Sequence, residues 1–139
     1  MPLVANFTLD QLNAAGADLY PGLLGIEVLE VTDGRVHAAL DLRPDHQAPN
    51  GYLHAGAVVS LADTACGYGC ILSLPEGATG FTTIELKTNF VGTARDGRIE
   101  CEARRIHGGR TTQLWDATVT GPDGRTLALF RCTQLLLSA

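Results

Sequence analysis

The segment from Ala55 to Ser73 constrains the fold more than any other part of the chain, because it is apolar on nearly every side. Small and apolar residues recur along it at three- and four-residue spacing, which is typical of a helix. The stripe that they form comprises Val58, Leu61, Ala62, Ala65, Gly69 and Leu72, and Val59, Cys66 and Ile71 widen it. A helix without a polar face must be covered over most of its surface, so we expect a sheet wrapped around it.

Alternating segments separated by turn signals supply this sheet. Strands are predicted over 26–31, 35–42, 79–92, 98–107, 110–120 and 125–137, with Asp33-Gly34 as a hairpin signal and the last four as an antiparallel meander. A short helix is expected from Thr8, as N-cap, to Gly16, and a non-regular bridge over 20–25. The chain is therefore predicted to form one α+β domain over 1–139, in which residues 1–21 are the N-terminal helix and bridge.

The composition argues against several classes of function. The net charge of −5 and the pI of about 5.2 disfavour a nucleic-acid-binding surface. No apolar run is long enough to span a membrane, and the N-terminus lacks the pattern of a secretory signal, so we expect a cytoplasmic protein. The four cysteines form no Cys-x-x-Cys pair, which favours reduced, buried thiols over a zinc site.

Asp63 is the only charged residue between Ala55 and Ser73. One interpretation is a structural carboxylate that pairs with a nearby donor or faces water. The other is a general base or nucleophile in a cleft, with its pKa set by burial. The start of the helix favours the second interpretation, because free N–H groups near Ala55 and Gly56 can stabilise developing negative charge, as in an oxyanion hole.

The spacing of these groups points to more than one subunit. Asp63 lies eight residues beyond Ala55, which corresponds to roughly 12 Å along a helix. One subunit therefore cannot easily bring both groups to one reacting carbonyl. Two subunits packed antiparallel would place the helix start of one beside Asp63 of the other, so we expect a dimer with two sites at its interface.

The sequence around this helix resembles the hotdog-fold thioesterases of the phenylacetate-degradation (PaaI-like) and 4-hydroxybenzoyl-CoA thioesterase type. The similarity rests on Gly51-Tyr-Leu-His54-Ala55-Gly56, on Leu61-Ala62-Asp63-Thr64-Ala65, and on the segments 83–90, 109–111 and 124–125. It implies five or six antiparallel strands around one long helix, dimerisation by sheet extension, and pairing of dimers into homotetramers. It also implies hydrolysis of an aryl- or medium-chain acyl-CoA to free acid and coenzyme A, with no metal or other cofactor.

The resemblance assigns catalytic roles to four matching residues. Asp63 would act on water as a general base or on the thioester as a nucleophile. The Ala55 backbone N–H would polarise the thioester carbonyl, and Thr83 would help to hold the attacking water. His54 would support the loop more than take part in the chemistry.

Further residues are expected to contact the substrate: Asn50, Gly56, Tyr68 and Arg110. Tyr68 could line an acyl pocket or simply pack in the core. Arg110 could meet the phosphates of coenzyme A or be an ordinary solvated charge. Alternation along 79–92 places Thr83 on the same face as Glu85, and His46 is expected at the surface.

Two positions depart from the family pattern. Ala55 replaces the first glycine of the family's His-Gly-Gly segment, which keeps the backbone donor but narrows the approach to it. Ala48 lies six residues before His54, where family members often have Asn or Gln, and Asn50 could take over that role.

Two other functions stay open at this point. A non-catalytic acyl-CoA-binding or sensing protein with the same fold is favoured by Ala48. An enoyl-CoA hydratase is disfavoured, because His54 and Asp63 are nine residues apart and in the reverse order from the hydratase pattern.

Overall fold

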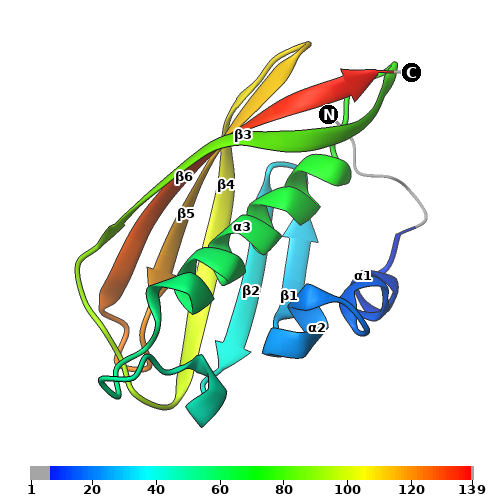
Figure 1. The fold of residues 1–139 in the computed structure, drawn as a ribbon. Helices are drawn as coiled ribbons and strands as arrows, with labels where there is room; N and C mark the ends of the chain where they lie inside the picture. Colours follow the sequence, from blue (N-terminus) through cyan, green and yellow to red (C-terminus); the bar gives the residue numbers. More distant parts are fainter. Residues whose placement is uncertain (1–6, 139) are drawn as a thin grey trace.

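Six strands form one antiparallel sheet, and the long helix α3 lies across one face of it (Figure 1). The computed structural model describes residues 7–138. Its elements are α1 (Leu9–Gly16), α2 (Tyr20–Leu24), β1 (Glu27–Thr32), β2 (Arg35–Asp41), a 3₁₀ turn (Pro44–His46), α3 (Ala55–Ile71), β3 (Ala78–Phe90), β4 (Arg98–Gly108), β5 (Thr112–Thr120) and β6 (Thr126–Ser138). The predicted α+β architecture, with one long helix against an antiparallel sheet, is confirmed.

The strand order differs from the predicted meander in the position of β3. The strands are arranged β1-β2-β4-β5-β6-β3, so β3 pairs with β6 and not with β4. Gly97 does adopt the positive φ of +88° expected of a turn glycine. However, the connection over 91–97 is longer than a two-residue hairpin loop and lets the chain cross to another part of the sheet.

Small residues on α3 allow it to lie close to the sheet. Its buried residues include most of the predicted stripe, namely Val58, Leu61, Ala62, Ala65 and Gly69, together with Cys66 beside it. A Cβ added at Gly69 would lie 2.3 Å from a ring carbon of Trp115, so only glycine leaves room for the indole. Trp115 is fully buried, and its Nε1–H donates to Gln113 at 2.8 Å. Gln113 in turn donates to the carbonyl oxygen of Ser73 at 3.1 Å, just beyond the end of the helix.

A β-bulge decides which side chains of β3 face the helix. Thr83 pairs with Gln134 and Glu85 with Thr133, which leaves Ile84 as the extra residue on β3. Gln134 is buried on the helix-facing side of β6, and Thr83 faces the same way. The prediction that Thr83 shares a face with Glu85 is therefore wrong, because the bulge reverses the alternation between them.

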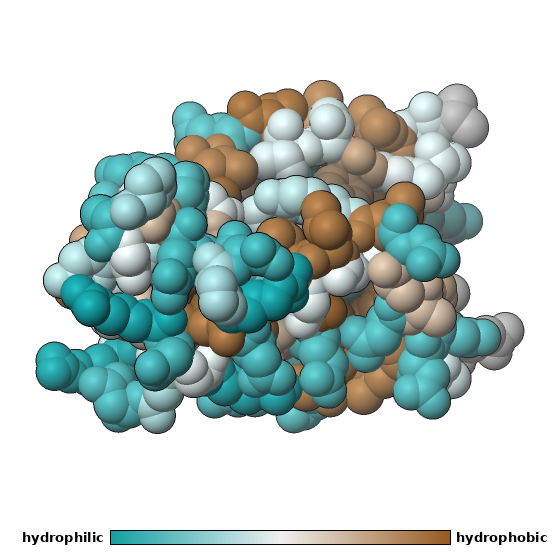
Figure 2. Space-filling model, turned by 60° about the horizontal axis from the view of Figure 1, so that its bottom comes forward, coloured by the Kyte–Doolittle hydropathy of each residue, from teal (hydrophilic) through white to brown (hydrophobic). Residues whose placement is uncertain are grey.

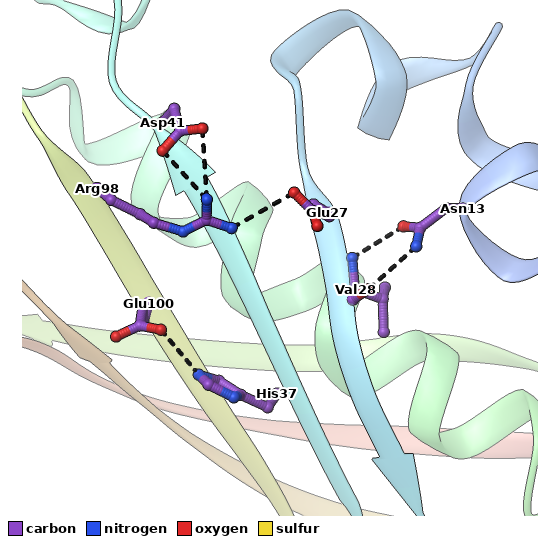
Figure 3. Close-up of polar contacts among 7 residues, drawn as sticks. All are labelled: Asn13, Glu27, Val28, His37, Asp41, Arg98 and Glu100. Carbon is purple, nitrogen blue, oxygen red and sulfur yellow. Dashed lines mark hydrogen bonds and ion pairs between the residues drawn. The ribbon is translucent and has the colours of Figure 1, made fainter. Parts of the chain in front are cut away.

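The first helix begins and ends as predicted. Thr8 is its N-cap and forms a capping box with Gln11. Asn13 fixes α1 to the sheet, because its side chain accepts a hydrogen bond from the Val28 N–H at 2.8 Å and donates to the Val28 carbonyl at 3.0 Å (Figure 3).

The prediction of a non-regular bridge over 20–25 is wrong, because residues Tyr20–Leu24 form the short helix α2. A proline in its first turn fits the start of a helix, and Gly25 ends it at φ +87°. The Tyr20 hydroxyl lies 3.1 Å from the Ser60 hydroxyl, so α2 contacts the first half of α3.

Ion pairs cover the face of the sheet opposite α3. Arg98 on β4 bridges Asp41 on β2 and Glu27 on β1, each at 3.4 Å, and His37 lies 3.2 Å from Glu100 (Figure 3). These groups are substantially exposed, so each pair contributes little, on the order of 1 kcal/mol or less. Their main effect is to keep this face polar.

By contrast, β3 forms one edge of the sheet and exposes apolar side chains. Ile84, Leu86 and Phe90 are 57%, 43% and 47% exposed. Figure 2 shows hydrophobic residues gathered in patches, several of them in the upper half of this view. A long apolar edge strand is open to pairing with a second chain.

Over residues 7–138, no helix combines the length and hydropathy needed to cross a membrane.

Candidate active site

Asp63 lies midway along α3, on the side that faces β3. One turn further along the helix, a Cβ added at Gly67 would lie 3.2 Å from Phe81 of β3. The Asp63 Oδ1 atom is buried and has no hydrogen-bond partner among the described residues. Burial raises the pKa of Asp63 above its ordinary value of 3.8. A carboxylate that is desolvated without being paired costs stability, which is typical of a functional group.

Strand β3 starts beside the C-terminal end of α3 and runs back along it (Figure 1). The helical turn from Gly67 to Asp63 covers about 6 Å, and the two residues from Phe81 to Thr83 cover about 6.6 Å in the same direction. By these lengths, Asp63 and Thr83 come to about the same level along α3 and β3. The Thr83 hydroxyl donates to Gln134 Oε1 at 2.6 Å.

His54 is the N-cap of α3, and its Nδ1 accepts the hydrogen bond of the Gly56 N–H at 2.8 Å. The Ala57 N–H donates to the His54 carbonyl at 3.0 Å. Ala55 is exposed, and within residues 7–138 its N–H makes no hydrogen bond. In this first turn, Ala55 therefore offers a free donor for an oxyanion, while the Gly56 donor is occupied by the cap.

Ala55 and Asp63 do not meet within one copy of the chain. Both lie on α3, which is continuous from Ala55 to Ile71, and their separation along its axis is roughly 12 Å. A single copy therefore keeps the free Ala55 N–H at the helix start apart from the Asp63 carboxylate in its middle.

Buried polar contacts hold the loop that leads into α3. His46 Nδ1 accepts from the Arg43 N–H at 3.0 Å, and His46 Nε2 donates to the Leu24 carbonyl at 2.8 Å. His46 is 2% exposed, so the expectation of a surface histidine is wrong, because the end of α2 supplies a buried partner. The His46 carbonyl accepts the N–H of His54 at 2.8 Å, which fixes the start of the helix.

Asn50, which could take over the role of the amide missing at Ala48, lies in a loop that is held by its own hydrogen bonds. The Ala48 backbone N–H donates to the Tyr52 carbonyl at 2.7 Å. Asn50 Oδ1 accepts from the Tyr52 N–H at 3.1 Å, so this oxygen is used within the loop. Gln47 donates to the carbonyl of Arg95 at 3.3 Å. Asn50 is exposed, and its amide nitrogen makes no hydrogen bond to another residue within 7–138.

Two predicted substrate residues lie apart from Asp63. Tyr68 follows it by five positions, about 140° around the helix, and its hydroxyl lies 2.5 Å from where a Cβ on Gly16 of α1 would be. Burial raises the pKa of Tyr68. These contacts favour a packing role. Arg110 is exposed in the turn between β4 and β5, and it makes no ion pair within the described part of the chain.

The cysteines supply no competing nucleophile. All four are buried, as predicted, and within residues 7–138 none of them forms a disulfide. Burial, reinforced by a hydrogen bond with Cys132, raises the pKa of Cys66 well above its usual range. Burial raises the pKa of Cys70 and of Cys101 to about 12. Over residues 7–138, no three His, Cys, Asp or Glu side chains are grouped to hold a metal ion.

Comparison with known proteins identifies the family of the chain. Residues 50–128 match the Thioesterase superfamily. The 1,4-dihydroxy-2-naphthoyl-CoA hydrolase of Escherichia coli is 31% identical over 133 residues, which cover 94% of this chain and 95% of that protein. A mutant of thioesterase PA1618 from Pseudomonas aeruginosa superposes with a TM-score of 0.93 at 30% identity over 100% of both chains. Thioesterase HI1161 from Haemophilus influenzae gives a TM-score of 0.91 at 26% identity, over 99% of this chain and 96% of that one. The chain therefore belongs to the Thioesterase superfamily and is a thioester hydrolase with the hotdog fold.

Proposed function

We propose that this protein hydrolyses an acyl-CoA thioester to the free acid and coenzyme A, with Asp63 as general base or nucleophile. The observation that carries the proposal is the buried Asp63 oxygen without a partner. A purely structural carboxylate would be paired or solvated. A general base, by contrast, must keep its lone pairs free to accept a proton, and a raised pKa makes it a stronger base. A thioester is already activated, so the reaction requires no cofactor.

In the general-base route, Asp63 takes a proton from a water molecule while the water oxygen forms a bond to the thioester carbonyl carbon. The Ala55 N–H of a second copy stabilises the negative charge on the carbonyl oxygen. The C–S bond then breaks, and the proton held by Asp63 passes to the departing thiolate. In the nucleophile route, the carboxylate attacks first, and water then hydrolyses the mixed anhydride to the same products.

The second copy is part of the proposal because one copy holds only half of each site. An antiparallel pair joined through the exposed edge of β3 would cover Ile84, Leu86 and Phe90. It would also bring the Ala55 N–H of one subunit towards Asp63 of the other, and such dimers would pair into homotetramers.

Arg110, exposed at the β4–β5 turn, is free to contact a coenzyme A phosphate.

The acyl group is proposed to be aryl or medium-chain. In support, one similar protein is named as hydrolysing 1,4-dihydroxy-2-naphthoyl-CoA, an aryl thioester. The apolar side chains exposed along β3 suit either kind of acyl group at an interface between subunits.

The test is thiol release from a panel of acyl-CoA esters by the wild type, Asp63→Asn and Asp41→Asn. Asp41 is a matched control, because it is an aspartate on the opposite face of the sheet with a side chain 74% exposed. We expect Asp63→Asn to lose about 10²-fold or more in kcat and Asp41→Asn to match the wild type. Full activity in Asp63→Asn would refute the mechanism. Tight acyl-CoA binding by the wild type without thiol release would instead favour a binding protein.

A further inference from the structure

Gln134 is a polar side chain in an otherwise apolar row of β6. The row faces α3 and contains Ala128, Phe130, Cys132 and Leu136, all of them buried. Gln134 itself is 0% exposed. Burying an amide is costly unless its oxygen and nitrogen both find hydrogen-bond partners. The partners of Gln134 therefore indicate what the residue does.

Those partners fix which way the amide points. Gln134 Nε2 donates to the sulfur of Cys132 at 3.5 Å, and Gln134 Oε1 accepts from the Thr83 hydroxyl at 2.6 Å. Thr83 and Gln134 are also directly opposite each other in the β3–β6 ladder. The oxygen of the Gln134 amide therefore points towards β3. The register of β6 with β3 places Gln134 opposite Thr83, and the hydrogen bond from Nε2 to Cys132 holds the amide in this orientation.

This orientation dictates the role of the Thr83 hydroxyl. An amide oxygen cannot donate, so Thr83 must give its single hydroxyl hydrogen to Gln134. The Thr83 oxygen then has only lone pairs left to offer a water molecule shared with Asp63. A water molecule between them would donate one hydrogen to Thr83 and the other to the Asp63 carboxylate, which leaves a lone pair of the water oxygen free for the carbonyl carbon.

We propose that Gln134 is a positioning residue that keeps the Thr83 hydroxyl an acceptor for the attacking water. The inference rests on the proposed function and on the expectation, implied by the family resemblance, that Thr83 helps to hold the attacking water. Without Gln134, the Thr83 hydroxyl can rotate and donate to the water oxygen, which would occupy the lone pair needed for attack.

The chain offers a matched control in Gln113. It lies directly opposite Gln134 on β5 and is 1% exposed. Its amide is bonded to Trp115 and to the Ser73 carbonyl, and it makes no hydrogen bond to Thr83. Replacing either glutamine by methionine removes a buried amide of the same size, but only one of the two acts on Thr83.

The experiment compares Gln134→Met, Gln113→Met, Thr83→Val and the double variant Thr83→Val with Gln134→Met. Thiol release gives kcat and KM for the acyl-CoA on which the wild type is most active, and thermal unfolding gives the stability of each variant. We expect Gln134→Met to lower kcat about tenfold, as for the loss of one hydrogen bond, and to keep KM within about twofold. In the Thr83→Val background the same change should have no further effect on kcat.

Additive effects of the two substitutions, or an equal loss of kcat in Gln113→Met, would overturn the proposal. If Gln134→Met does not fold, Gln134→Asn takes its place, because its shorter side chain withdraws the acceptor from Thr83. Failure of the two proposals can be told apart. Full activity in Asp63→Asn refutes the proposed function, whereas an inactive Asp63→Asn beside a fully active Gln134→Met refutes the role of Gln134 alone.

Discussion

Replacing Gly69 by alanine should destabilise the protein, whereas replacing Gly67 by alanine should not, although the two positions lie in the same helix. Alanine in place of glycine ordinarily stabilises a helix interior by about 1 kcal/mol. At Gly69, however, the new Cβ would lie 2.3, 2.7 and 2.9 Å from three ring carbons of Trp115, whereas ordinary contact begins at 3.4 Å. At Gly67 the nearest atom is Cζ of Phe81 at 3.2 Å.

The size of the effect follows from how firmly each ring is held. Trp115 cannot easily withdraw, because it is fully buried and hydrogen-bonded to Gln113 at 2.8 Å. Overpacking a core costs about 1–3 kcal/mol, and an overlap of this size against a fixed ring belongs at the upper end. After the helix gain is subtracted, Gly69→Ala should lose about 2 kcal/mol, or roughly 7 °C in Tm for a chain of this length. Phe81 is only half-buried, so Gly67→Ala should be neutral or gain up to about 1 kcal/mol.

Thermal and urea unfolding, followed by circular dichroism at equal protein concentration, measure the difference. Adding Trp115→Phe to Gly69→Ala supplies a control, because the smaller ring should relieve the overlap and recover part of the loss. A Gly69→Ala protein as stable as Gly67→Ala would refute the claim that the indole requires glycine at this position.

Substitutions at Asp63 and at His54 test the site itself. Asp63→Asn should raise Tm at pH 7, because burial raises the folded-state pKa of Asp63 above 3.8. The folded protein then binds the proton more tightly, and its free energy of unfolding falls as pH rises between the unfolded and folded pKa values. The gain should therefore be largest at neutral pH and vanish as pH falls towards 3.8; a gain independent of pH would contradict this cause. Wild-type kcat/KM should fall as pH is lowered through the same raised pKa, since only the carboxylate acts as a base. His54→Ala should cost about 1 kcal/mol by removing the acceptor of the Gly56 N–H, and His54→Asn should recover most of it; equal unfolding temperatures for the two variants would argue against a capping role.

Features that depend on near neighbours in the chain could be predicted from the sequence. The cap at Thr8, the hairpin at Asp33-Gly34 and the apolar stripe of α3 each depend on residues only a few positions apart. The place of β3 in the sheet could not be predicted in this way. It depends on pairing with β6, whose residues lie 38 to 60 positions further along the chain than their partners, and the turn signal at Asp96-Gly97 carries no information about that partner.

The same distinction applies to the site. Asp63 stood out because it is the single charge on an apolar helix, a pattern that its own neighbours reveal. His46 did not, because its buried partner is the carbonyl of Leu24 on a different element. Gln134 carried a usable signal, since it occupies an inward-facing register of β6 between Cys132 and Leu136. Reading the alternation of that strand would have marked it as a buried amide in need of a partner.

The bulge at Ile84 connects the fold to the proposed chemistry. Without it, regular pairing would place Glu85 opposite Cys132, in the buried row that faces α3, and a second carboxylate would lie on the same side as Asp63. Two nearby carboxylates would compete for one proton and raise the pKa of at least one of them further. The bulge instead turns Glu85 to the opposite face while both Thr83 and Leu86 face α3. One extra residue in β3 therefore leaves Asp63 as a lone carboxylate and sets beside it the hydroxyl that would hold its water.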